Sequence, residues 1–192
     1  MQFTGTRSLV ALTLIVSATA CASTKPTAVV PSRPDTQIVQ ADVEAAQRNW
    51  CAALVEIGHL GATGGNAKGT ATDVLSKAYD YDAGTVLFKP TLTFGAQTFR
   101  MAKQGALAYF VGGDSSYPDD KGFALKGWVK CEPAIAGVVA HGDIAIAMGN
   151  VRFEDAKGKV VTVDKTFGYL RRADGDLRIV LHHSSLPYAP AK

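Results

Sequence analysis

Four runs of strand-forming residues follow one another at hairpin spacing toward the end of the chain, and they constrain the fold more than any other feature. The runs are residues 128–140, 144–153, 160–170 and 177–184. The short segments between them contain the Gly and Asp residues that hairpin turns favour. Because antiparallel strands can be joined by such short turns, this part of the chain predicts an antiparallel meander.

Helical patterns precede these strands. Between residues 42 and 58, apolar side chains recur at intervals of three and four residues, which is typical of an amphipathic helix that includes Trp50. Thr70 or Thr72 could cap a second helix that runs through residue 78, and residues 99–111 carry a third helical pattern. Helices followed by a meander predict an α+β fold, in which N-terminal helices pack in a curved antiparallel sheet. Trp50 and Trp128 are expected in its core.

Two segments between these elements predict irregular backbone. Residues 58–69 contain five glycines and are expected to form a loop, without the spacing that a phosphate-binding loop requires. A strand is expected over residues 85–94, but Pro90 confines it to a sheet edge or a bulge. Thr91 follows this proline directly, where an irregular backbone can aim a side chain into a cavity.

The N-terminal segment predicts export. Residues 8–20 are apolar but too few to span a bilayer, and they end in small residues, so residues 1–20 are interpreted as a secretory signal peptide. Cys21 follows, as in a bacterial lipobox, although Ala18 stands where leucine is usual. A periplasmic protein is therefore expected, either lipid-anchored through Cys21 or free. Residues 21–37, rich in Ser, Thr, Pro and Ala, predict a flexible tether before one domain over residues 38–188.

Charge and cysteine content limit the possible partners. The chain has 20 Lys and Arg against 17 Asp and Glu, and no basic cluster interleaved with aromatic residues, so no nucleic-acid partner is expected. A membrane contact is expected only through a lipid on Cys21. In an oxidising compartment Cys51 and Cys131 could form a disulfide, which the sequence alone does not decide.

The segment 177–187 joins a strand to a cluster of polar groups. In an extended strand, His182 and Ser184 share one face, and His183 and Ser185 share the other. A buried face that becomes polar only at its end is typical of the mouth of a pocket for a small polar ligand. The alternative is that these groups cap the strand end and face solvent.

Four blocks of sequence, in this order, resemble the iota class of carbonic anhydrases. The blocks are residues 86–92 (VLFKPTL), 105–114 (GALAYFVGGD), 163–169 (VDKTFGY) and 182–187 (HHSSLP). The likeness covers residues 40–188. It implies the cone-shaped fold of nuclear transport factor 2-like and SnoaL-like proteins, and residues 163–185 are similar to the end of the calcium/calmodulin-dependent kinase II association domain.

The resemblance implies a metal-free reaction in which hydroxyl and imidazole groups around the cavity of the cone hold bicarbonate. Carried over block by block, the catalytic positions are Thr91, Tyr109, His182 and Ser184. The hydroxyl groups are expected to stabilise the negative charge that grows on the oxygens of carbon dioxide. His182 is expected to accept or relay the proton that the attacking water loses, or else Tyr109 orients that water.

Asn150 and Ser185 are weaker candidates for substrate binding. Asn150 interrupts an apolar strand and could reach the same cavity, but an amide that satisfies a bulge explains it equally well. Lys165 and Tyr169 are interpreted as surface or interface residues. Neither a metal nor another cofactor is expected. A catalytic zinc takes three protein ligands, and if the strand of His182 and His183 is regular, no three of the histidines at 59, 141, 182 and 183 point to one place.

The main hypothesis is therefore a carbonic anhydrase that interconverts carbon dioxide and bicarbonate. The alternative is a non-catalytic envelope lipoprotein that binds a small carboxylate or serves as an oligomeric assembly domain. A homodimer is expected under either hypothesis, with Ile179 and Leu181, on the face opposite His182, as candidates for its interface.

Overall fold

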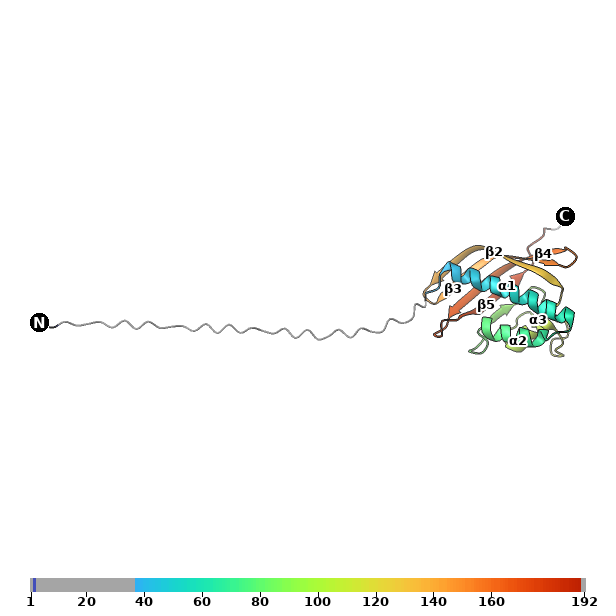
Figure 1. Ribbon diagram of the computed structural model, residues 1–192, viewed down its shortest axis with the longest axis horizontal. Coiled ribbons are helices and arrows are strands. Elements are labelled where there is room, and N and C mark those ends of the chain that lie inside the picture. Colours follow the sequence, from blue (N-terminus) through green and yellow to red (C-terminus); the bar gives the residue numbers. More distant parts are fainter. Residues whose placement is uncertain (1, 3–36, 191–192) are drawn as a thin grey trace. The chain divides into compact units, whose positions relative to one another are not determined.

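A five-stranded sheet in the order β1-β5-β4-β3-β2 is the framework of the protein (Figure 1). The computed structural model describes residue 2 and residues 37–190. The predicted signal peptide apart from residue 2, Cys21 and nearly all of the predicted tether therefore lie outside the described residues. The elements are, in chain order, α1 (Gln40–Thr63), α2 (Ala67–Ala78), β1 (Leu87–Lys89), the 3-10 helix η1 (Gly95–Gln97), α3 (Lys103–Val111), β2 (Trp128–His141), β3 (Ile144–Asp155), β4 (Val160–Arg171) and β5 (Leu177–Ser185).

The predicted meander is confirmed, and with it the α+β class. Strands β2, β3, β4 and β5 pair antiparallel in sequence order. The expectation of a wholly antiparallel sheet is wrong at one edge, where β1 pairs parallel with β5 and Phe88 lies opposite His182. A parallel pair needs a long crossover, and the crossover from β1 to β5 contains α3 and three strands. β1 ends at Lys89, just before Pro90, and lies at the sheet edge as predicted.

The glycine-rich segment 58–69 is mostly helical, which corrects the predicted loop. Only residues 64–66 separate α1 from α2. Gly58 lies inside α1 at a point where the helix packs too closely for a side chain. A Cβ on Gly58 would stand 2.6 Å from the carbonyl oxygen of Ala124. Gly64, with φ of 75°, is the glycine that ends α1.

Two further boundaries differ from the sequence-based expectation. Asn66, rather than Thr70 or Thr72, caps α2, because its side-chain oxygen accepts a hydrogen bond from the N–H of Gly69. The third helix begins at Lys103, later than expected, after the 3-10 turn of η1.

Helices and sheet share one apolar core. The helical stripe of α1 is buried as predicted, and so are Trp50 and Trp128. In β3, Ala147 and Val151 point into the core while Ile146 and Met148 are exposed, so the sheet has an inner and an outer face. Within the described residues, no helix is long and apolar enough to cross a membrane.

A disulfide joins Cys51 of α1 to Cys131 of β2, with their Cα atoms 5.1 Å apart. It links the first helix to the far edge strand across 80 residues of sequence. A cross-link that closes a loop of this size restricts the unfolded chain and is typically worth roughly 4 kcal/mol.

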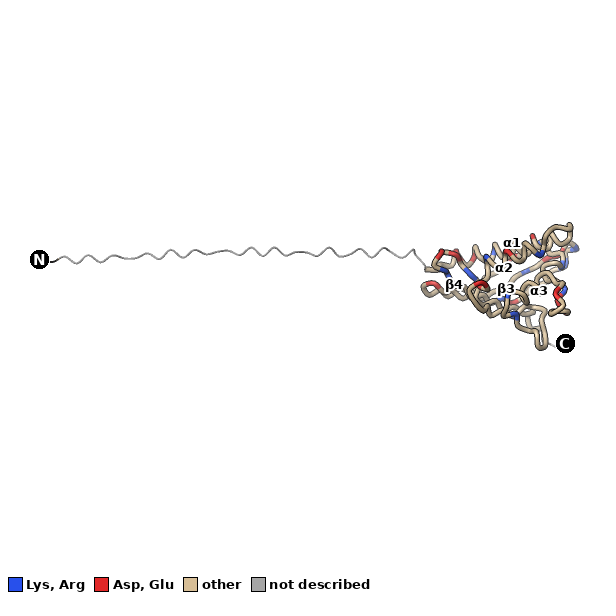
Figure 2. Tube along the Cα trace, turned by 90° about the horizontal axis from the view of Figure 1, so that it is seen from below, with Lys and Arg blue, Asp and Glu red and all other residues tan. Residues whose placement is uncertain are grey.

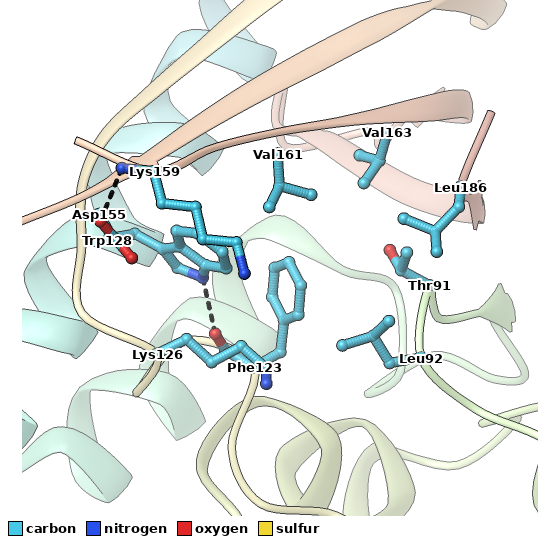
Figure 3. A pocket seen from close by; sticks show the side chains of 10 residues that line it. All are labelled: Thr91, Leu92, Phe123, Lys126, Trp128, Asp155, Lys159, Val161, Val163 and Leu186. Atoms are coloured by element: carbon cyan, nitrogen blue, oxygen red, sulfur yellow. Dashed lines mark hydrogen bonds between the residues drawn. The ribbon is translucent and has the colours of Figure 1, made fainter. Parts of the chain in front are cut away.

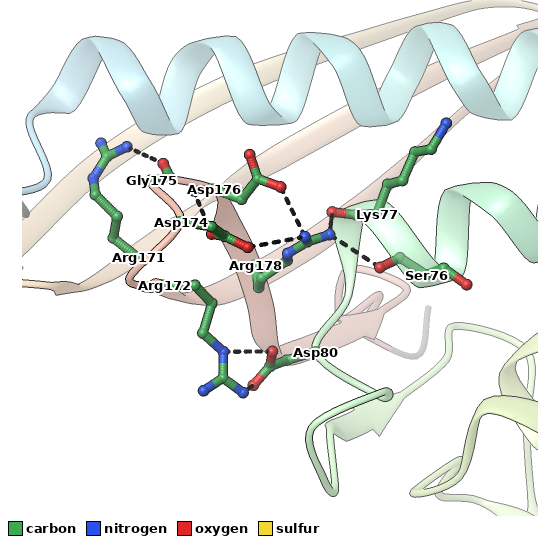
Figure 4. Close-up of polar contacts among 9 residues, drawn as sticks. All are labelled: Ser76, Lys77, Asp80, Arg171, Arg172, Asp174, Gly175, Asp176 and Arg178. Atoms are coloured by element: carbon green, nitrogen blue, oxygen red, sulfur yellow. Dashed lines mark hydrogen bonds and ion pairs between the residues drawn. The ribbon is translucent and has the colours of Figure 1, made fainter.

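Arginine contacts fasten the β4–β5 hairpin to the end of α2 (Figure 4). Arg172 donates to both carboxylate oxygens of Asp80, at 2.9 and 2.5 Å, and Arg178 donates to the last carbonyl groups of α2. The backbone N–H of Asp80 also donates to the carbonyl of Ile179, at 3.0 Å. These contacts hold Tyr79, which caps the C-terminus of α2, against β5. Elsewhere in the described chain acidic and basic residues are interspersed (Figure 2).

A bulge in β5 changes which residues face the core. Gly168 lies opposite Leu181 but Tyr169 lies opposite Ile179, so Val180 is the extra residue. The bulge turns Ile179 to the same inner face as His182, and both are buried. The expectation that Ile179 lies on the opposite face, available to a dimer, is therefore wrong.

Candidate active site

A cavity of about 410 Å³ opens between the sheet and the loops that follow β1 and α3 (Figure 3). Its lining residues are Thr91, Leu92, Phe123, Lys126, Trp128, Asp155, Lys159, Val161, Val163 and Leu186. Most of the wall is apolar, and Figure 3 shows the Lys126 and Lys159 side chains extending toward the space between the walls. Thr91 contributes a hydroxyl group to this wall.

The predicted hydroxyl groups of Thr91, which lines the cavity, and Ser184, which is buried behind it, are in contact. Their Oγ atoms are 2.5 Å apart, and the two residues are 9% and 0% exposed. The β1–β5 pairing brings them together, and Lys89 secures it by donating from Nζ to the carbonyl of Ser184 at 2.8 Å. Since one hydroxyl must donate to the other, the pair keeps one O–H group that can donate to a ligand.

Tyr109 of α3 supplies the third hydroxyl. Its ring stacks on Phe123 at 5.4 Å between centroids. Among the described residues the buried hydroxyl has no partner with hydrogen-bond geometry. Burial raises the pKa of Tyr109, and the nearby Thr91 hydroxyl and Leu92 backbone offset part of this rise, so the phenol is a protonated donor at neutral pH. A buried donor without a partner is costly, which favours an acceptor from a ligand or water.

The fourth predicted residue, His182, has both ring nitrogens occupied by protein. Nδ1 lies 2.9 Å from the hydroxyl of Tyr79 and Nε2 lies 2.7 Å from Nζ of Lys165. The ring stacks between Phe88 and Phe167, with centroid distances of 4.6 and 4.4 Å. Burial holds the pKa of His182 well below its ordinary value, and a positive charge on the nearby Lys165 or His183 would lower this pKa further. The imidazole is therefore neutral and turned toward these partners.

Lys165 and Tyr169 are buried on the inner face of β4, which corrects their interpretation as surface residues. Lys165 is 5% exposed and Tyr169 is 1% exposed. The alternation of β4 places Val163, Lys165, Phe167 and Tyr169 on one face. The buried Val163 and Phe167 two residues on either side of Lys165 are the sequence signal that could have located it.

Tyr79 and Trp50, which lie beside His182, were also not assigned to the site by sequence reasoning. Trp50 Nε1 donates to the Tyr79 hydroxyl at 2.9 Å, and the Tyr79 hydroxyl contacts His182. A tyrosine just after a helix carries no sequence signal for such a contact, because the contact depends on how α2 meets β5.

Asn150 and Ser185, the weaker candidates, lie away from the hydroxyls of Thr91, Ser184 and Tyr109. Asn150 is exposed, because its neighbour Val151 faces the core and successive side chains of a strand point to opposite faces. Its amide donates to Asp164 at 2.7 Å. Ser185 is half-buried, and strand alternation turns it away from the face of Ser184. No group of three or more His, Cys, Asp or Glu side chains within the described residues is arranged to hold a metal ion.

Comparison with known proteins gives consistent matches. A family model described as metal-independent carbonic anhydrase matches residues 41–186. A metal-independent carbonic anhydrase from Nostoc sp. (strain PCC 7120 / SAG 25.82 / UTEX 2576) is 49% identical over 153 residues, which is 79% of this chain and 75% of the relative. The crystal structure of the iota-carbonic anhydrase from a cyanobacterium, complexed with bicarbonate, superimposes with a TM-score of 0.80 at 47% identity, covering 81% of this chain and 96% of that chain.

More distant structures share less. A nuclear transport factor 2 (NTF2-like) superfamily protein from Salmonella enterica subsp. enterica serovar Typhimurium str. LT2 matches with a TM-score of 0.47 at 10% identity, over 79% of this chain and 92% of that chain.

The two buried tyrosines predict opposite responses to loss of the hydroxyl. Tyr109→Phe should change the free energy of unfolding by less than about 0.5 kcal/mol, or raise it, because the hydroxyl has no protein partner. Tyr79→Phe should lower it by about 1–3 kcal/mol, because Trp50 and His182 each lose a hydrogen-bond partner. Urea denaturation followed by tryptophan fluorescence measures both values, and equal losses would contradict this account.

Proposed function

This chain belongs to the family of metal-independent carbonic anhydrases, and on that premise we propose that it interconverts carbon dioxide and bicarbonate at the cluster of Thr91, Ser184 and Tyr109. The observation that carries the proposal is the contact of 2.5 Å between the Thr91 and Ser184 hydroxyls at a cavity wall, beside the unpartnered hydroxyl of Tyr109. Thr91 lines the largely apolar cavity, and Ser184 and Tyr109 lie buried behind it. Three neighbouring hydroxyls at such a wall suit a small, planar anion with three oxygens.

The proposed reaction joins water to carbon dioxide. The water oxygen bonds to carbon and loses a proton, while one C=O electron pair moves onto oxygen and gives bicarbonate. The Tyr109 O–H and the spare O–H of the Thr91–Ser184 pair donate to the oxygens on which this negative charge grows. Because these donors are held in place before the reaction, stabilising the charge needs little reorganisation.

The surroundings of the cluster support entry of carbon dioxide and exit of an anion. Apolar residues of the wall, such as Val163 and Leu186, accommodate an uncharged gas. Lys126 and Lys159 place positive charge beside the cavity, which favours bicarbonate there. Since both nitrogens of His182 contact protein groups, we propose that the proton passes to water in the cavity rather than directly to His182.

We expect Thr91→Val and Ser184→Ala each to lower kcat/KM for carbon dioxide hydration about 10²–10³-fold, because each breaks the hydroxyl pair that holds its one spare O–H group toward the developing anion. Stopped-flow hydration assays with a pH indicator measure this. Wild-type activity should survive treatment with a chelator. Ser115→Ala, an exposed hydroxyl outside the cavity, should retain full activity.

Hydration that does not exceed the buffer rate would contradict the proposal and favour a binding protein for small carboxylates. Loss of activity on chelation, restored by a metal, would contradict the metal-free reaction.

We also propose that the outer face of the sheet forms a homodimer. Apolar side chains on β2 and β3 are 50% to 69% exposed at neighbouring positions: Val139, Ile144, Ile146 and Met148. A contiguous apolar patch of this kind on a sheet face is typical of an interface between subunits.

Met148→Lys should convert the dimer to a monomer, because it places a charge within the apolar patch. Size-exclusion chromatography with light scattering measures the mass. Tyr188→Lys, at an exposed position outside the patch, should leave the dimer intact. A wild-type monomer at micromolar concentration would contradict this proposal.

Finally, we propose that residues 1–20 direct export to the bacterial periplasm and that Cys21 becomes a lipidated N-terminus. The pattern of small residues before Cys21 supports this, and so does the Cys51–Cys131 disulfide, since disulfides persist in oxidising compartments.

Cys21→Ser should move the protein from the membrane fraction to the soluble periplasmic fraction, because it removes the thiol that lipid would modify. Fractionation and the intact mass of the exported protein measure this. A wild-type mass equal to that of the unmodified chain would contradict lipidation and leave export untouched.

A further inference from the structure

A lysine and a histidine are buried together without an acidic partner. Nζ of Lys165 lies 2.7 Å from Nε2 of His182, and the residues are 5% and 1% exposed. Lys165 takes part in no ion pair within the described chain. A buried ammonium group without a counter-ion is very costly, so a buried lysine in such a site loses its proton.

Counting protons along the contacts gives the same result when each buried donor is paired with an acceptor. The indole N–H of Trp50 can only donate, so the Tyr79 oxygen accepts from it. The Tyr79 hydroxyl has one other partner among the described residues, Nδ1 of His182, so its own proton must go there. A neutral His182 that accepts at Nδ1 carries its proton on Nε2, which faces Lys165.

An ammonium group has no lone pair to accept that proton. At 2.7 Å, two donors would face each other. An uncharged amine accepts the bond through its lone pair. Its own N–H groups are then near the Trp50 ring, whose centroid lies 4.6 Å from Nζ. The arrangement is thus satisfied when neither Lys165 nor His182 carries a charge.

We infer that Lys165 is an uncharged amine that holds His182 in its Nε2–H form, and that Lys165 is a positioning residue for the hydroxyl cluster. The effect on the reaction rests on the proposed carbonic anhydrase function. The connection runs through the sheet. Lys165 lies directly opposite Ser184 in the β4–β5 register, and Phe88, next to Lys89 in β1, lies opposite His182.

Fixing the His182 ring therefore fixes how β1 lies against β5. The ring fills the space between Phe88 and Phe167, and the same β1–β5 pairing brings Thr91 to Ser184. If the His182 proton moves from Nε2 to Nδ1, the ring loses its hydrogen bond with Tyr79 or with Lys165. We expect the Thr91–Ser184 contact to loosen with it.

Protonation of the pair should disturb this arrangement. The nearby titratable groups are Tyr79 at the end of α2, Lys89 of β1 and His183, which is exposed on the other face of β5, and none of them supplies a negative charge at neutral pH. Burial holds the pKa of Lys165 well below its ordinary value, and the charge of Lys89 adds to this.

The sign of the resulting pH dependence follows from proton counts. Above the folded pKa of Lys165 and below about 10.4, its ordinary value, the unfolded chain binds this proton and the folded chain does not. Stability therefore rises with pH across this window, and the contribution stops changing above it. One such proton lowers the unfolding equilibrium constant tenfold for each pH unit.

Nitrogen NMR of wild-type protein tests the protonation state directly. Spectra of ¹⁵N-labelled protein, with His182 assigned by comparison with His182→Phe, should show a lone pair at Nδ1, a proton at Nε2 and no titration from pH 6 to 8. The Lys165 Nζ should show the chemical shift of an amine. An imidazolium, an Nδ1–H tautomer or an ammonium shift would overturn the inference, whatever the enzyme's rate.

Lys165→Met tests the linkage and the positioning role. Its unfolding constant should lack the tenfold decrease per pH unit that wild type should show above the folded pKa of Lys165 and below about pH 10. Its kcat for carbon dioxide hydration should fall at least tenfold with KM nearly unchanged, and the His182 nitrogens should exchange between tautomers. Wild-type kcat and pH profile in this variant would overturn the positioning role. A wild type that does not hydrate carbon dioxide would refute the proposed function but leave the NMR result standing.

Discussion

The pairing of β5 with β1 is the interaction on which the rest of the site depends. It places Phe88 opposite His182 and brings Thr91 next to Ser184. Polar groups buried on the inner face of β5 are cut off from water, so each needs a partner from a neighbouring element. Tyr79 of α2 and Lys165 of β4 provide those partners for His182.

Two polar clusters lie beside each other in this interior, and they differ in whether their hydrogen bonds are complete. Around His182, contacts run continuously from Trp50 through Tyr79 and His182 to Lys165, and aromatic rings enclose these residues. Around Thr91 the hydroxyl groups retain an unused donor, and Tyr109 has no protein partner. A complete network gives rigidity, whereas an incomplete one at a cavity wall has affinity for an additional group. The division explains how His182 and Ser184, two residues apart on the inner face of β5, can have different tasks.

Much of the fold could be predicted from the sequence, because the meander and the α1 stripe are periodic patterns that directly reflect burial. The parallel partner of β5 could not, since a three-residue strand next to Pro90 has no periodicity to read. The resemblance identified the three hydroxyl residues that the fold brings together. It did not reveal the partners of His182. Lys165 was misplaced because lysine is so rarely buried that its alternation with Phe167 carried too little weight.

The two halves of the hydroxyl pair are 93 residues apart in sequence, and the later one lies in the last strand. Helices and the first hairpins can form from contacts between near neighbours, but this pairing has to wait for almost the entire polypeptide. A nascent chain emerging from the ribosome could therefore form its helices and first hairpins before Ser184 is available to pair with Thr91. The hydroxyl pair is therefore among the last contacts to form as the chain folds.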